Sequence, residues 1–166
     1  MTERGFRSLG LLALAALLLG CDAEQKCEPI GCQSGVWAVA EPNGAWKEGN
    51  YQLEVTQDGE TDDCAFSLPQ ALPTANVTVN LDCGKSLRAW LAATSSCTDC
   101  TIDDPFQLGV FIDGLPNDLS IKLTYADAVV LTDTRAVEYE DVFPRGKECS
   151  NGCTQSKYQL AVRFSE

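Results

Sequence analysis

Strict alternation of apolar and polar side chains recurs along much of the chain, and it constrains the fold more than any other feature. The alternation is clearest in residues 51–56, 77–82, 119–125 and 158–164. Successive side chains of a β-strand point to opposite faces, so each stretch has one face for a core and one for water. The pattern therefore predicts antiparallel strands covered on one side, and it argues against a helical fold.

Shorter apolar runs and turn sequences lie between these stretches. The further candidate strands are residues 36–40, 64–68, 87–93, 106–112, 128–132 and 136–143. Tight turns are favoured by Asn43-Gly44, Asp58-Gly59, Asp113-Gly114 and Asn151-Gly152. Helical spacing of the apolar residues over 86–94 leaves a short helix as the alternative there. The whole pattern predicts an all-β fold, an antiparallel β-sandwich of immunoglobulin-like or similar type, with a meander over 115–145.

The N-terminal segment has the layout of an export signal. Arg4 and Arg7 precede an uninterrupted apolar run, residues 11–19, and Gly20 ends it. A membrane-spanning helix needs ~20 apolar residues, so this run is too short to span a bilayer. Basic flank, short apolar core and small terminal residue are typical of a signal peptide. A buried helix is disfavoured because the acidic residues that follow offer no continuing apolar face.

The end of this segment, Leu18-Leu19-Gly20-Cys21, resembles the lipobox of bacterial lipoproteins. The resemblance implies cleavage before Cys21 and lipid attachment to it, so that the membrane itself is a partner. Two or more acyl chains give stable anchoring. We expect a signal peptide at 1–20, a lipidated tether at 21–34 and a single β-sandwich domain at 35–166, exported to the cell envelope. Asp22 leaves the choice between inner and outer membrane open. The alternative to a lipoprotein signal is a plain secretory signal in which Cys21 is incidental.

The cysteine count agrees with a lipidated Cys21. The chain has nine cysteines, an odd number, and setting Cys21 aside leaves a set that can pair in an oxidising compartment. Those cysteines are Cys27, Cys32, Cys64, Cys83, Cys97, Cys100, Cys149 and Cys153. Eight cysteines allow 105 connectivities, so spacing only suggests a pairing. Short spacing favours Cys27–Cys32, Cys97–Cys100 and Cys149–Cys153, which leaves Cys64–Cys83.

Composition excludes several kinds of chemistry. The chain has no histidine, which excludes Ser-His-Asp and Cys-His catalysis. Its formal net charge of −12 argues against a nucleic-acid partner. The acidic pairs Asp62-Asp63, Asp103-Asp104 and Glu138/Glu140 leave a carboxylate-based hydrolase only as a distant alternative. We therefore expect no enzymatic activity and no cofactor.

No metal site is predicted. Cys97-Thr98-Asp99-Cys100 has the spacing of redox and zinc motifs, but it lies in a polar loop of an exported chain, where a structural disulfide is favoured. The loops 58–63 and 113–118 carry several oxygen donors that could suit calcium. Neither follows the EF-hand pattern, so solvated turns are the simpler interpretation.

The tryptophans offer the one candidate ligand contact. Trp46 lies in the polar stretch 43–49, where we expect it to be exposed and able to stack on a glycan. Trp37 and Trp90 lie in apolar runs and are expected in the core.

The second half of the chain resembles a group of bacterial proteins. The pattern Y-x4-P-x-G-x2-C-x3-C is carried by Tyr139, Pro144, Gly146, Cys149 and Cys153. It is similar to that of uncharacterised lipoproteins of myxobacteria and related predatory soil bacteria, which also begin with a lipobox. The resemblance covers roughly residues 1–21 and 50–165, although Arg145 stands where those proteins have asparagine. It implies an exported, lipid-anchored small β-domain and carries over no catalytic residues.

These observations favour a non-enzymatic binding or interaction module of the cell envelope with a protein or glycan partner. Loops carry specificity in such folds, so the loops 43–49, 94–105 and 147–155 are the candidates for contact. A carbohydrate-binding or structural envelope component is the alternative function.

Overall fold

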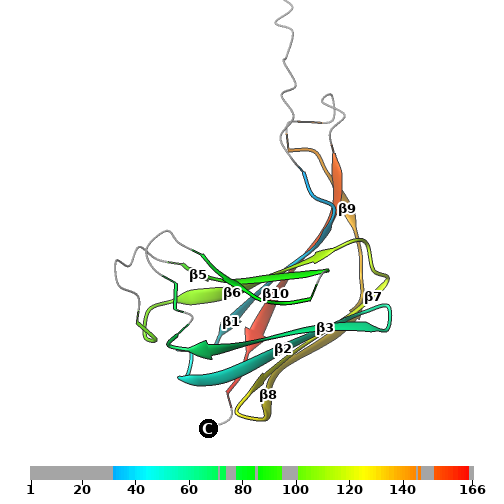
Figure 1. Cartoon of the computed structure of the whole chain (residues 1–166). Helices are drawn as coiled ribbons and strands as arrows, with labels where there is room; N and C mark the ends of the chain where they lie inside the picture. Colours follow the sequence, from blue (N-terminus) through cyan, green and yellow to red (C-terminus); the bar gives the residue numbers. More distant parts are fainter. Residues whose placement is uncertain are drawn as a thin grey trace, which may run out of the picture.

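The described strands form two sheets that pack face to face (Figure 1). The computed structural model describes residues 32–70, 72–73, 78–84, 86–94, 101–144, 146 and 152–164. One sheet, sheet A, has the order β4-β5-β6-β1-β10-β9, and the other, sheet B, has the order β3-β2-β7-β8. The strands are β1 (Gly35–Pro42), β2 (Gly49–Gln57), β3 (Glu60–Leu68), β4 (Val79–Leu81), β5 (Leu87–Ala93), β6 (Phe106–Asp113), β7 (Asp118–Tyr125), β8 (Ala128–Ala136), β9 (Glu140–Val142) and β10 (Cys153–Val162). The predicted all-β sandwich is confirmed.

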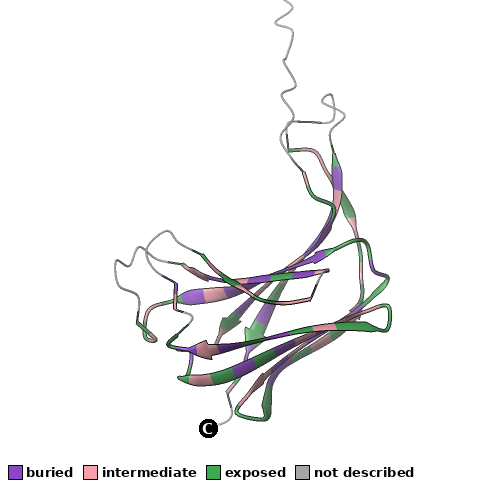
Figure 2. Ribbon diagram, viewed as in Figure 1, coloured by how far each residue is buried: buried purple, intermediate pink, exposed green. Residues whose placement is uncertain are grey.

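Side-chain alternation places the core between the sheets. Tyr51, Leu53 and Val55 of β2 are buried while their neighbours are more exposed, and the same alternation appears along β7 (Figure 2). The segment 87–93 is strand β5 rather than a helix, because it pairs along its whole length with β6.

Two sequence predictions about strand order and direction hold only in part. β1 and β10 run parallel, from Gly35 opposite Gln155 to Pro42 opposite Val162, so the sandwich is not wholly antiparallel. The alternation of side chains is the same in both directions and could not reveal this. The meander over 115–145 holds only for β7 and β8, because the chain then crosses to sheet A and forms the short β9 beside β10.

Two disulfides lie among the described residues. Cys64 of β3 bonds with Cys83, which follows β4, and this confirms the predicted pair. The other bridge joins Cys32 to Cys153, so the suggested pairs Cys27–Cys32 and Cys149–Cys153 are wrong. Parallel pairing brings the starts of β1 and β10 together, which short sequence spacing could not indicate. Cys21, Cys27, Cys97, Cys100 and Cys149 lie outside the described residues.

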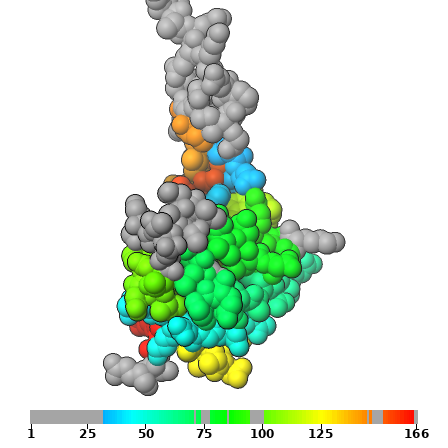
Figure 3. All heavy atoms as spheres, turned by 60° about the vertical axis from the view of Figure 1, so that its left-hand side comes forward, coloured from blue at the N-terminus to red at the C-terminus, as the bar shows by residue number. Residues whose placement is uncertain are grey.

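The sandwich has two distinct ends. Cys32, Cys153 and β9 lie at one end, called here the entry end because the chain enters the fold there. The β7–β8 turn at Ala126-Asp127 lies at the other, distal end, and Figure 3 shows this yellow segment far from the blue start of β1.

Candidate functional site

The structure brings two of the three candidate loops together and separates the third. The loop 43–49 and the described residues of the loop 94–105 line one hollow at the distal end, where the Trp46 indole also donates a hydrogen bond to the carbonyl oxygen of Phe106 at the start of β6 (2.9 Å). The described part of the loop 147–155 lies at the entry end, where Cys153 is tied to Cys32. The described parts of the three loops therefore do not form a single binding surface.

Trp46 is not an exposed ligand contact, and that prediction is wrong. Its side chain is only 3% exposed and stacks on Phe106, with ring centroids 5.4 Å apart. It also contacts Tyr51 and Phe164 edge-on. The polar flanks of Trp46 suggested a surface residue, but they belong to a short connection that folds back over the end of the core.

The 43–49 loop is held down by two tyrosines. The Tyr51 hydroxyl donates to the Lys47 carbonyl oxygen (2.7 Å) and accepts from the Lys47 amide (3.1 Å), while the Tyr125 hydroxyl donates to the Glu48 carbonyl oxygen (2.9 Å). Burial raises the pKa of Tyr51 to about 12, because its phenolate would lose contact with water. The loop 43–49 thus packs over the core at this end of the sandwich.

Trp37 and Trp90 are not in the main core, contrary to expectation. Both are partly buried on the outer face of sheet A, where they contact one another at 5.8 Å between ring centroids. Trp90 lies flat across Gly109, where an added Cβ would lie 2.3 Å from Trp90 Cε2. Phe111 fills the space beside Trp37 (4.6 Å) beneath the guanidinium of Arg88 (4.4 Å), so these side chains form a small second cluster outside the sandwich.

The acidic loops have structural roles. Asp58 Oδ1 accepts the amide hydrogens of Asn117 (2.9 Å) and Asp118 (3.0 Å), and the Asp62 carboxylate accepts from the Ser86 hydroxyl. Among the described residues, no group of three or more acidic or cysteine side chains is placed to hold a metal ion. The acidic pairs lie on separate elements, since Asp62-Asp63 belong to β3, Asp103-Asp104 precede β6 and Glu140 begins β9.

A hollow lies among the described residues where the edges of β8 and β10 diverge. β8 is one of the two edge strands of sheet B, and β10 pairs with β9 only from Cys153 to Gln155. Two hydrogen bonds join the chain segments on either side, one from the Arg163 amide, just after β10, to the Val130 carbonyl oxygen of β8 (2.8 Å), and one from the Ser156 hydroxyl of β10 to the carbonyl oxygen of Glu138, just after β8 (2.6 Å). Between them is a hollow of about 410 Å³, called here the β8–β10 cleft.

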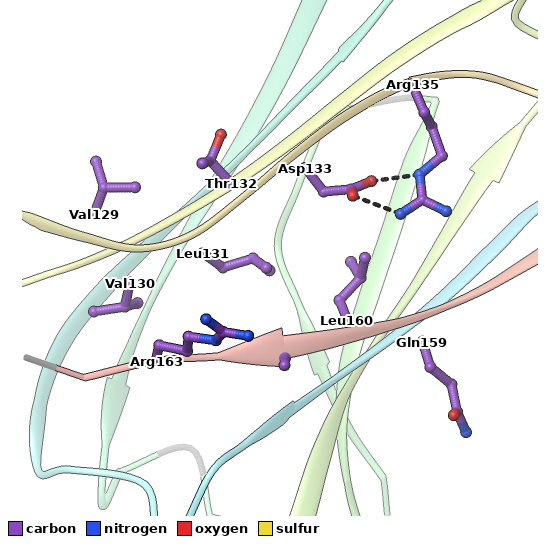
Figure 4. A pocket seen from close by; sticks show the side chains of 10 residues that line it. Val129, Val130, Leu131, Thr132, Asp133, Arg135, Gln159, Leu160 and Arg163 are labelled. Carbon is purple, nitrogen blue, oxygen red and sulfur yellow. Dashed lines mark hydrogen bonds and ion pairs between the residues drawn. The ribbon is translucent and has the colours of Figure 1, made fainter.

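The cleft has an apolar floor and polar ends (Figure 4). It is lined by Val129, Val130, Leu131, Thr132, Asp133, Arg135, Gln159, Leu160, Ala161 and Arg163. Leu131 and Leu160 lie between the strands, while Asp133 and Arg135 form an ion pair at one end. Hydrogen bonding to Asp133 raises the pKa of Arg135, whose guanidinium also lies 4.1 Å from the centroid of the Tyr158 ring.

A β-bulge shapes one wall of the cleft. Thr124 pairs with Val129 and Leu123 pairs with Leu131, which leaves Val130 as the extra residue. Val130 and Leu131 are both buried, and the bulge turns the Val130 carbonyl toward Arg163. Val129 beside it is 54% exposed, a large aliphatic side chain left at the rim.

Sequence reasoning missed this cleft because it cannot tell an edge strand from a central one. One signal was present in the exposed row formed by Lys157, Gln159 and Ala161 of β10 and by Arg163 just after it, which contains no acid in a strongly acidic chain. Comparisons with models of protein families, with curated proteins and with solved structures found no match to this chain. Within the described residues, no helix is long and apolar enough to cross a membrane.

Proposed function

We propose that the chain is an exported, lipid-anchored, non-enzymatic interaction module of the bacterial cell envelope. The observation that carries this proposal is the β8–β10 cleft, where two strand edges and an exposed aliphatic rim surround a hollow of about 410 Å³. Unpaired strand edges beside apolar surface are sites where proteins bind extended segments of other chains.

Export and anchoring are supported by two independent features. The lipobox-like Leu18-Leu19-Gly20-Cys21 supplies the anchor, and the two disulfides suit an oxidising compartment. Cys32 holds the start of the domain only a short tether away from Cys21. In this arrangement the entry end faces the membrane, and the resemblance to myxobacterial lipoproteins fits the same picture.

The anchor is tested by lipid labelling. Cells expressing the protein with or without Cys21→Ala are grown with an alkyne-tagged palmitate, and label and membrane association are measured after fractionation. We expect label and membrane association for the unaltered chain and neither for Cys21→Ala. Equal labelling of the two would overturn the proposed anchor.

The interaction is tested by site-specific photo-crosslinking in the native envelope. A photoreactive amino acid replaces Thr132, which is exposed at the cleft, and in a matched variant replaces Asp63, which is exposed on the opposite edge of sheet B. We expect one discrete crosslinked protein from position 132 and none from position 63. Identical or absent crosslinks at the two positions would count against a binding role for the cleft.

Carbohydrate binding remains a second candidate, and the outer face of sheet A favours it. Trp37 and Trp90 are partly exposed there, and indole rings stack on sugars. Titration of envelope oligosaccharides while tryptophan emission is followed tests this candidate. A shift that is lost in Trp37→Ala but kept in Trp46→Phe would support it.

A further inference from the structure

We propose that the free edge of β10 binds an extended acidic peptide by strand addition. The peptide would lie beside β10 as an additional edge strand of sheet A, next to the residues that β9 does not cover. This inference rests on the proposed function and names the chemistry of the partner. β9 occupies the edge position beside β10 for three residues, and the described residues leave the rest of that edge without a strand. An added strand would therefore continue an edge position that the fold already uses.

The peptide groups of β10 point in a defined order. The Val162 carbonyl accepts the Asn43 amide on the β1 side, whereas the Arg163 amide donates to Val130 on the opposite side. In a strand the N–H and C=O of one residue point to the same side, and this side alternates from residue to residue, so those of Lys157, Gln159 and Ala161 face away from β1 toward the cleft. These three residues present the N–H and C=O groups that an added strand would use.

The side chains along this edge favour an acidic partner. Among the described cations, Arg88, Lys122 and Arg135 each pair with a carboxylate. Lys157 and Arg163 are exposed and have no carboxylate partner in the described residues, although the chain carries a net charge of −12. Both lie at the ends of the free edge, and opposite charges on facing residues of adjacent strands attract.

The same two cations disfavour a second copy of this chain as the occupant. When two β10 edges overlap completely over residues 157–163 in antiparallel fashion, Lys157 of each copy lies opposite Arg163 of the other. Like charges at facing positions destabilise such a pair. A different chain with acids six positions apart meets both cations instead, and small aliphatic side chains between them would enter the cleft over Leu160.

The test uses a designed heptapeptide with blocked ends, Glu-Val-Thr-Val-Thr-Val-Glu. Its fluorescent form is titrated with the full-length protein in detergent at low salt, and anisotropy is measured. Acids and threonines then share the outward face, and the valines face the cleft. We expect the peptide to bind saturably. Replacing both glutamates by lysine should weaken binding at least about tenfold. Replacing one threonine by proline, which lacks an N–H donor, should abolish binding.

Variants of the protein distinguish the contribution of side-chain charge to peptide binding from that of backbone hydrogen bonding. Arg163→Gln and Lys157→Gln should each weaken binding about threefold, the range measured for exposed charge pairs, while Lys122→Gln on the other sheet should leave it unchanged. Ala161→Pro should abolish binding without unfolding the protein, because the Ala161 amide does not bond to β1, and a thermal melt checks this. Equal binding of the lysine peptide, or binding that survives Ala161→Pro, would overturn strand addition.

The proposed function and strand addition can fail independently of one another. If the Ala161→Pro variant still binds the peptide and the crosslink from position 132 also forms, strand addition is wrong but the cleft still has a partner. If the acidic peptide binds and no crosslink forms, the edge chemistry stands and the interaction role in the envelope is wrong.

Discussion

Cys32 and Cys153 are joined by a disulfide across a sequence separation of 121 residues. The bridge ties the start of the first strand to the start of the last, and these two strands then run parallel as neighbours in the middle of sheet A. It therefore holds the two ends of the domain in register at the place where the chain enters the fold.

Removing this bridge should destabilise the protein substantially. Closing so long a loop restricts the unfolded chain, and such bridges contribute about 2–5 kcal/mol. We expect the Cys32→Ala/Cys153→Ala double variant to lose free energy of unfolding in that range, measured by urea denaturation without reductant. Peptide mapping of the unreduced protein provides the check, since a fragment linking Cys32 to Cys27 would contradict the structure.

Gly109 should not tolerate a side chain. An added Cβ would lie 2.3 Å from Trp90 Cε2, so Gly109→Ala forces the indole off the sheet and should cost about 1–3 kcal/mol. The same substitution in a Trp90→Leu background should cost less, because the obstructing ring is gone. A double-mutant cycle from thermal or urea melts measures the coupling, and additive losses would rule out this contact.

Trp46 should behave as a core residue in spite of its polar sequence neighbours. Trp46→Phe removes the donor to the buried Phe106 carbonyl oxygen and part of the stacked contact, so we expect a loss of about 1–3 kcal/mol. Trp37→Phe, at a partly exposed position on the outer face, should cost less. Urea melts of both variants settle the comparison, and a larger loss at Trp37 would contradict the burial of Trp46.

Asp58 should stabilise the fold through backbone hydrogen bonds rather than through calcium. Asp58→Ala leaves the amides of Asn117 and Asp118 without their acceptor, which should cost about 1–3 kcal/mol. Calcium or a chelator should not change the melting temperature of either the unaltered protein or the variant. A calcium-dependent rise that Asp58→Ala abolishes would instead reveal a metal site.

Alkaline pH should destabilise the protein as it rises from about 10 to about 12. Burial raises the pKa of Tyr51 to about 12, and that of Tyr139 likewise, whereas an unfolded tyrosine has a pKa near 10. Between these values the unfolded state releases protons that the folded state retains, so stability is complete below pH 10 and is lost as pH rises further. Unfolding free energies at pH 9, 10 and 11 should fall less steeply for Tyr51→Phe, and parallel profiles would contradict this origin.

Much of the fold could be predicted from local pattern. Alternation in residues 51–56 and 119–125 located β2 and β7, and the turn pair Asp58-Gly59 lies between β2 and β3. The pair Cys64–Cys83 was reached as the remainder after three short-range pairs, and the structure contains this bridge between β3 and the segment after β4. These features depend on residues that are near one another along the chain, where side-chain period and turn chemistry act directly.

Errors arose where distant parts of the chain meet. Trp46 looked exposed because its sequence neighbours are polar, yet three rings from distant parts of the chain enclose it, those of Tyr51, Phe106 and Phe164. Trp37 and Trp90 looked like core residues because their runs are apolar, but the alternation left open which face each sheet would bury.

The sequence by itself determined an all-β chain with its strands in nearly the right places, an N-terminal pattern typical of a lipidated export signal, and a strongly acidic net charge of −12. Only the tertiary structure decided which strands became edges, that β1 and β10 run parallel, and that Cys32 reaches Cys153. The physical reason is that side-chain periodicity acts over a few residues, whereas the order of strands follows from packing two sheets around one shared core. The β8–β10 cleft exists because that packing leaves two edges unjoined, and no single stretch of sequence encodes it.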